Sequence, residues 1–132
     1  MGFELPIHFR LALSRLTAQG VLATQATSPF FAPEAFWCIV RTVESVAADE
    51  QRVRPYHLNV PSFGEWGFVL VAPENAGAPK IPPGLDVKFL DPDVLAGMFQ
   101  FPGDMQPVAV EPNRLTTAVL AGYYRDGWSA FH

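Results

Sequence analysis

Cysteine and basic residues are scarce in this 132-residue sequence, which has one cysteine and 9 Lys and Arg residues against 13 Asp and Glu residues. The single cysteine, Cys38, cannot form an intrachain disulfide, so a disulfide-stabilised scaffold is excluded. A formal net charge of −4 without a basic cluster is not the electrostatic footprint of a nucleic-acid-binding protein. We therefore expect no nucleic-acid partner, and a buried, structural thiol at Cys38.

Long hydrophobic segments are missing as well. No apolar run approaches the roughly 18 to 20 residues that a membrane-spanning helix needs, and the first residues lack the profile of a signal peptide. The sequence therefore predicts no membrane contact by this chain and a cytoplasmic location.

Three kinds of catalytic motif are also absent. The segment Gly64-Glu65-Trp66-Gly67 lies between two predicted strands, so it is not the glycine-rich strand-to-helix turn that cradles a phosphate or nucleoside. The three histidines, His8, His57 and His132, are isolated from one another and from paired carboxylates, so each is predicted to be structural and no metal site is expected. No serine has the context of a nucleophile elbow, which excludes hydrolase chemistry of that kind.

What the sequence does have is the composition of a folded domain, with 49% hydrophobic and 17% charged residues. Two stretches carry apolar residues at every third or fourth position, which predicts amphipathic helices. The first spans His8 to Leu16. The second opens at Pro33 and Glu34, which both suit the first turn of a helix, and continues to Ala47.

Three further stretches favour β-strands. Val21–Thr24 is a short apolar run, which predicts a strand buried on both faces. Val53–Val60 contains Pro55, and a proline cannot donate to a strand ladder, so this strand is expected at a sheet edge. Gly67–Ala72 is apolar throughout and is expected inside the sheet. Strand, crossover helix, edge strand and a hairpin return together predict an α/β fold.

The C-terminal half is richer in proline and weaker in pattern. Residues 73–83 have the composition of a linker, and Val87–Leu90 is compatible with a short strand. Asp91-Pro92 predicts a helix that Asp91 caps and that runs to Phe99. Residues 113–124 are compatible with a last helix.

The hairpin between the second and third predicted strands displays Ser62, Phe63, Glu65 and Trp66. Two aromatic rings and a carboxylate suit an organic cation, because the rings can pack on its methylenes while the carboxylate supplies a counter-charge. The alternative is a plain hairpin whose Phe63 and Trp66 pack into the core.

Several segments resemble the spermidine synthase (polyamine aminopropyltransferase) family. Residues 55–70, PYHLNVPSFGEWGFVL, look like its late hairpin, and residues 20–33, GVLATQATSPFFAP, look like its fifth strand and the turn that follows. Shorter matches lie in the tail, in the segments KFLDP (88–92), FPGDM (101–105) and YYRDGW (123–128). The resemblance is closest to the branch whose soluble domain follows a set of membrane helices. If this chain belongs to a longer parent protein, the resemblance implies that it is the cytoplasmic domain of a membrane protein.

This resemblance implies a fold and a set of site residues. The fold is the C-terminal portion of a Rossmann-like sheet of the S-adenosylmethionine-dependent methyltransferase type, with three mixed strands, flanking helices and an irregular Pro-rich tail. Its return strand runs antiparallel between the two others. The implied polyamine-binding residues are Gln25, Phe63, Glu65 and Trp66. Residues 1–73 would form the C-terminal half of the Rossmann domain, and 74–132 a linker and a family-specific extension.

The family's catalytic parts precede the segment present here. They are the glycine-rich loop for decarboxylated S-adenosylmethionine, the acid that holds its ribose and the catalytic Asp. The expectation is therefore a chain that binds no cofactor itself, has no catalytic residue and is inactive without the missing N-terminal half. Its partners would be a polyamine or diamine and, through the open edge of the first strand, that missing half or a second copy. The alternatives are a stand-alone binding or interaction module and part of a related methyltransferase.

Overall fold

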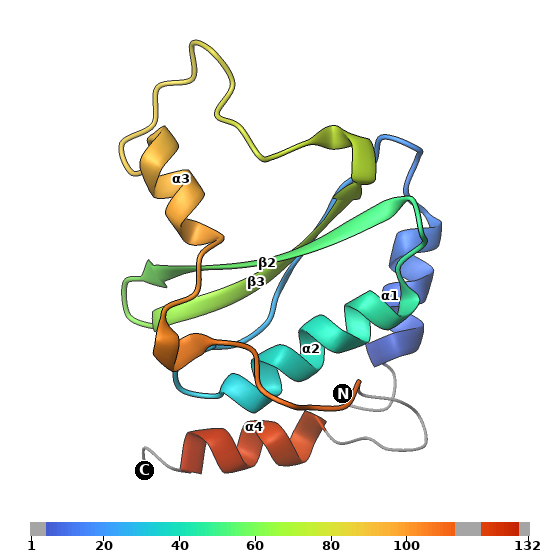
Figure 1. Ribbon diagram of the computed structural model, residues 1–132, viewed down its shortest axis with the longest axis vertical. Coiled ribbons are helices and arrows are strands. Elements are labelled where there is room, and N and C mark those ends of the chain that lie inside the picture. The colour runs from blue at the N-terminus through green and yellow to red at the C-terminus, as the bar shows by residue number, and fades with distance from the viewer. Residues whose placement is uncertain (1–4, 113–119, 130–132) are drawn as a thin grey trace.

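Three strands and four α-helices make up the part of the chain that the structure, a computed structural model, describes: residues 5–112 and 120–129 (Figure 1). In chain order they are α1 (Leu5–Ser14), β1 (Leu22–Gln25), α2 (Pro33–Val46), β2 (Gln51–Val60), β3 (Gly64–Pro73), α3 (Pro92–Met98) and α4 (Leu120–Ser129). Two 3-10 turns, η1 (Glu74–Ala76) and η2 (Gly103–Met105), lie between them. No helix within the described ranges is both long and apolar enough to cross a membrane.

The sheet has the strand order β1-β3-β2, and both ladders are antiparallel. The strands β1 and β2 therefore run in the same direction on either side of β3, and α2 carries the chain from one to the other. This confirms β2 as the edge strand and β3 as the central strand. The α/β arrangement is compatible with the C-terminal portion of a Rossmann-like fold.

The hairpin turn is shorter than predicted. β2 ends at Val60 and β3 begins at Gly64 instead of Gly67, so only residues 61–63 connect the two strands. At its other end, β2 begins at Gln51 instead of Val53. The reversal uses positive φ angles of 77° at Ser62 and 76° at Gly64. A three-residue loop with left-handed residues matches the twist of the flanking strands. Glu65 and Trp66 consequently belong to a strand and not to a loop.

The prediction for the first strand is wrong in its burial. β1 alternates half-buried and exposed residues, and Val21 just before it is 54% exposed. The cause is topological, because β1 has a described strand neighbour on one side only. Ala23 and Gln25 also point to the face of the sheet that α2 does not cover.

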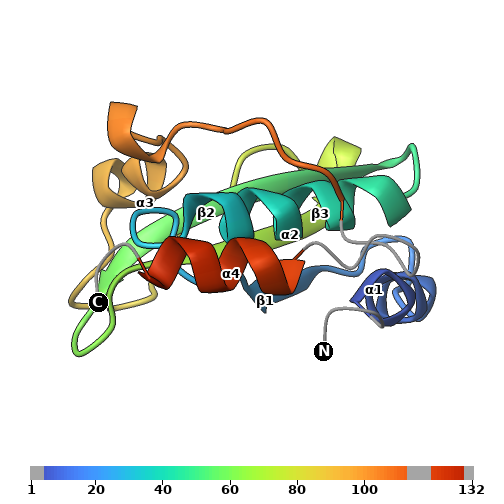
Figure 2. The ribbon, with the colours of Figure 1, turned by 90° about the horizontal axis from the view of Figure 1, so that it is seen from below.

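The core lies between α2 and the odd-numbered residues of β3. Val69 and Val71 are fully buried there against Phe36, Val40 and Val43 of the helix. The helix starts at Pro33 as predicted and ends one residue before Ala47. Its opposite face, with Cys38 buried, packs against Trp128 of α4, and Figure 2 shows α4 alongside α2. The predicted buried thiol is confirmed.

The tail passes around the β2 edge of the sheet. Phe99 packs on Tyr56, whereas Phe101 packs on Trp37 of α2, on the other face of the sheet. Figure 1 shows α3 above the sheet and α2 below it. The boundary predicted at residue 73 stays a prediction.

Local predictions in the tail have mixed outcomes. Asp91 caps α3 as predicted, since its side chain accepts a hydrogen bond of 2.8 Å from the Val94 backbone N–H. The strand expected at Val87–Leu90 is absent, because that stretch is irregular and largely exposed. The last predicted helix overlaps α4 from Leu120, while its residues 113–119 lie outside the described residues.

Gly67 marks the closest approach between the sheet and α2. A Cβ added at this position would lie 2.2 Å from the Phe36 ring and 2.9 Å from the Thr27 carbonyl oxygen. Overpacking of this kind costs about 1 to 3 kcal/mol. We expect Gly67→Ala to lower the free energy of unfolding by about that amount in urea titrations.

The matched control is Gly97→Ala in α3, where an added Cβ meets nothing within 4 Å. This variant should keep or slightly raise stability, since alanine is the better helix former. Equal stability of Gly67→Ala and the parent chain would contradict the tight contact.

Candidate functional site

Gln25 and Trp66 meet on the face of the sheet opposite α2. Gln25 is the last residue of β1 and lies across from Phe68 on β3, so Trp66 is its diagonal neighbour on the same face. The Trp66 indole Nε1–H donates a hydrogen bond of 3.3 Å to the Gln25 amide oxygen. The two predicted residues are therefore brought together by the sheet register.

Phe63 completes what we call the aromatic lip, the pair Phe63 and Trp66. Their ring centroids are 5.3 Å apart, and the planes are tilted by 37°. Phe63 is 59% exposed, so it is not a core residue of the described structure. The plain-hairpin interpretation, with both rings in the core, is wrong for Phe63.

Glu65 is separated from the other three residues. Consecutive strand residues point to opposite faces, so Glu65 lies on the α2 face, whereas Trp66 lies on the open one. There the Glu65 carboxylate contacts Nδ1 of His57, with only 26% and 11% of the two side chains exposed. Glu65 thus shares the end of the sheet with the lip but not its face.

His57 is the residue that the sequence analysis missed. Its Nδ1 faces the Glu65 carboxylate and its Nε2 faces the Gln100 carbonyl oxygen, and its ring lies 4.7 Å from the Phe101 ring. With an oxygen acceptor at each nitrogen, both can donate only when the ring is an imidazolium. The hairpin register held the missing signal, because His57 pairs with Gly67 and so is diagonal to Glu65.

The turn after β1 fixes Gln25 in place. Ala26 N–H donates to the Gly67 carbonyl at 2.9 Å, and Gly67 N–H donates to the Thr27 carbonyl at 2.6 Å. The buried Ser28 hydroxyl oxygen accepts hydrogen bonds from the backbone N–H groups of Phe30 and Phe31. The chain therefore leaves β1 along one hydrogen-bonded path, which fixes the backbone on the C-terminal side of Gln25.

Tyr56 lies on the same open face of the sheet as Gln25, on the other side of Phe68. The two rings are stacked with centroids 5.1 Å apart, and Phe68 stands between Tyr56 and Gln25 in the register. Burial raises the pKa of the Tyr56 phenol, so this group stays neutral at physiological pH. In the described part of the chain, no group of three or more His, Cys, Asp or Glu residues could hold a metal ion.

The His57–Glu65 pair allows a direct energetic test. A hydrogen bond to a charged group in a half-buried site contributes about 1.5 to 3 kcal/mol. We expect a double-mutant cycle of His57→Gln and Glu65→Gln, measured by urea unfolding, to give a coupling energy of about 1 to 2 kcal/mol.

The exposed pair Arg52 and Glu74 is the control for this cycle. Their nearest charged atoms are 3.9 Å apart and their side chains are 53% and 60% exposed. Such pairs couple by well under about 1 kcal/mol. Equal coupling in the two cycles would refute a specific contact between His57 and Glu65.

The curated proteins that match this chain carry the same kind of name. No protein-family model matches the chain. Polyamine aminopropyltransferase 2 of Ralstonia nicotianae is 41% identical over 121 residues, which cover 91% of this chain and 23% of the relative. The polyamine aminopropyltransferase of Leptospira interrogans is 41% identical over 121 residues, 92% of this chain and 24% of the relative. That of Mycobacterium tuberculosis is 38% identical over 125 residues, 91% of this chain and 23% of the relative.

The chain therefore spans about a quarter of the length of these relatives. The predicted link to the membrane-linked branch stays a prediction. Over nine-tenths of its length, the chain is similar to one segment of the polyamine aminopropyltransferases, the spermidine synthase family, at 38 to 41% identity.

Proposed function

We propose that this chain forms the amine-binding end of an aminopropyltransferase, which transfers an aminopropyl group from decarboxylated S-adenosylmethionine to a diamine. The observation that carries the proposal is the contact between the Gln25 amide and the Trp66 indole, with Phe63 beside it on an exposed turn. The names of the related proteins support the same substrate class.

The chemistry of the lip and Gln25 suits a protonated amine. The Gln25 amide oxygen has two lone pairs, and Trp66 takes one of them, so the other can accept from an ammonium or amine N–H. The ring faces of Trp66 and Phe63 can pack on methylene groups and attract a cation. One glutamine and two rings therefore match a short aliphatic chain with an amine at its end.

Glu65 has a different part in this proposal from the one that the sequence suggested. Its carboxylate already contacts His57 on the α2 face, where an imidazolium would balance its charge, so Glu65 holds the hairpin in place and does not pair with the diamine.

Aminopropyl transfer needs groups beyond this set. The amine nitrogen attacks the carbon beside the sulfonium, a carbon–nitrogen bond forms, the carbon–sulfur bond breaks, and the amine proton passes to a base. The sequence has no glycine-rich strand-to-helix turn for the nucleoside. We assign nucleoside binding and the base to other parts of the enzyme, in keeping with relatives about four times longer.

The outer edge of β1 is the surface where those parts would join. β1 pairs with β3 on one side, and the described residues place no strand on the other. An unpaired strand edge readily adds a further strand. We assign this edge to the remainder of the enzyme's sheet rather than to a second copy of the chain, and we propose a cytoplasmic location for the enzyme.

A chimaera tests the proposal. The matching segment of the Ralstonia nicotianae relative is replaced by this chain, and aminopropyl transfer to putrescine is measured. We expect the chimaera to be active and Gln25→Ala to raise KM for putrescine about tenfold, which corresponds to one lost hydrogen bond to a charged group. KM for decarboxylated S-adenosylmethionine should stay unchanged.

The control is Gln19→Ala, an exposed glutamine in the turn before β1, which should leave both constants unchanged. Spermidine titrated into the isolated chain gives a second readout that does not need turnover, with millimolar or tighter binding that Gln25→Ala and Trp66→Ala weaken. A Gln25→Ala chimaera with the parent's KM for putrescine would refute the assigned role.

A further inference from the structure

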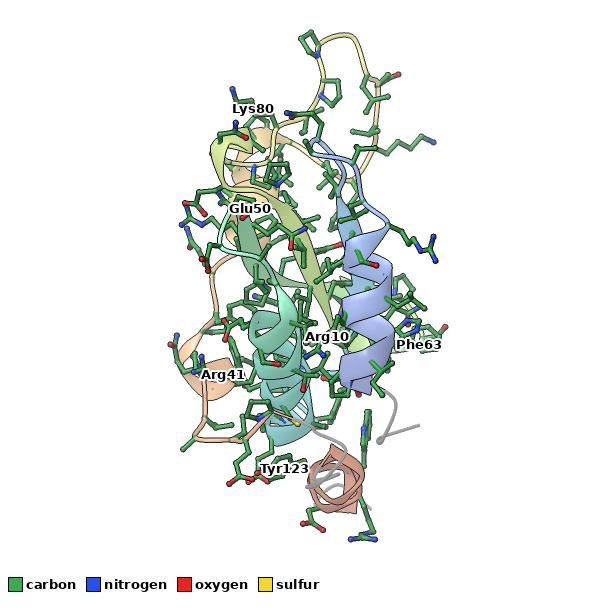
Figure 3. All side chains as sticks on the ribbon, turned by 90° about the vertical axis from the view of Figure 1, so that its right-hand side faces the viewer. Arg10, Arg41, Glu50, Phe63, Lys80 and Tyr123 are labelled. Atoms are coloured by element: carbon green, nitrogen blue, oxygen red, sulfur yellow. The ribbon has the colours of Figure 1, made fainter. Side chains whose placement is uncertain are left out.

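A cavity lies on the same open face of the sheet as the aromatic lip, near the β2 edge. It has a volume of about 470 Å³, within the usual range of small-molecule sites. β2, the loop after η1 and α3 each contribute to its walls. Figure 3 shows Lys80 of this cavity and Phe63 of the lip in separate parts of the molecule.

The charge of this cavity is positive. Arg54 and Lys80 both line it, and none of the described residues that line it is acidic. Arg54 Nη2 donates a hydrogen bond of 3.1 Å to the Gly77 carbonyl oxygen. This bond uses one of the five guanidinium N–H groups, so the others keep their capacity to donate. A guanidinium and an ammonium in one hollow attract an anion and repel a polyamine.

No carboxylate of the described residues forms an ion pair with Arg54 or Lys80. Asp91, next to the lining residue Pro92, accepts a hydrogen bond from Val94 N–H in the cap of α3. Glu74, at the end of β3, lies 3.9 Å from Arg52. Asp93 also adjoins Pro92, but neither it nor these two carboxylates pairs with Arg54 or Lys80 in the described structure, so these cations keep their capacity for an anionic ligand.

The walls of the cavity are apolar. Ile81 and Leu95 line it from two sides, and Phe99 lines it where its ring packs on Tyr56, 5.2 Å away. Apolar walls favour a hydrocarbon body, because burying it removes its surface from water. A bare inorganic anion would leave these walls unfilled.

We propose that this cavity binds an organic monocarboxylate with an aliphatic or aromatic body, the carboxylate lying against Arg54 and Lys80. A guanidinium matches a carboxylate in a bidentate pair. The volume admits a body of about eight carbons. The site is separate from the amine lip and takes ligands of the opposite charge, so it does not depend on the proposed aminopropyl transfer.

Octanoate titrated into the full 132-residue chain tests the site, with amide chemical shifts as the readout. We expect saturable shifts at Leu95, Ala96 and Phe99, with a dissociation constant on the order of 0.1 to 1 mM. Octylammonium, which has the same body and the opposite charge, should not bind there. Arg54→Gln should lower the affinity for octanoate about tenfold, and Lys80→Gln should lower it about threefold.

Two matched variants keep the test specific. Arg41→Gln removes an exposed guanidinium on α2, and Lys88→Gln removes the other lysine of the chain, and neither should change octanoate affinity. Ala96→Trp fills the cavity from an exposed position and should abolish binding without disturbing the core. Equal binding of octanoate and octylammonium, or octanoate affinity unchanged in Arg54→Gln and Ala96→Trp, would overturn the proposal.

Discussion

The structure depends on the antiparallel return of β3 between two strands that run the same way. This register sets Gln25 beside Phe68 and sets His57 beside Gly67. The absence of a side chain at Gly67 favours this register, because it lets the Phe36 ring of α2 and the turn after β1 close on the same point. Packing at this glycine thereby helps to position two groups at the hairpin end of the sheet: Gln25 with the aromatic lip, and His57 with Glu65.

Strand alternation divides this end between two faces. On the open face, Gln25 and the aromatic lip offer an acceptor and two π surfaces with little burial. On the α2 face, His57 and Glu65 form a shielded pair that also ties the hairpin to the tail through the Gln100 carbonyl oxygen. The exposed group is suited to contacting a ligand. The shielded pair is suited to holding the hairpin against the tail.

The sequence predicted the elements whose signals are local and strong. The apolar period of α2, the Asp91 cap and the edge position imposed by Pro55 all agree with the structure. The side-by-side placement of Gln25 and Trp66 came from family resemblance, since these residues are 41 positions apart and no local pattern links them. The sequence pattern places Glu65 in a loop, whereas the three-residue turn leaves it on β3, and its contact with His57 follows from the strand register alone.

The central claim is that Gln25 and the aromatic lip form one surface that receives an aliphatic amine. Nuclear Overhauser contacts from spermidine methylene protons to the protein test it most directly. The account predicts contacts to the Trp66 indole and the Phe63 ring, and a shift of the Gln25 side-chain amide on binding. Bound spermidine whose methylene contacts fall elsewhere, with the Trp66 and Gln25 signals unmoved, would contradict it.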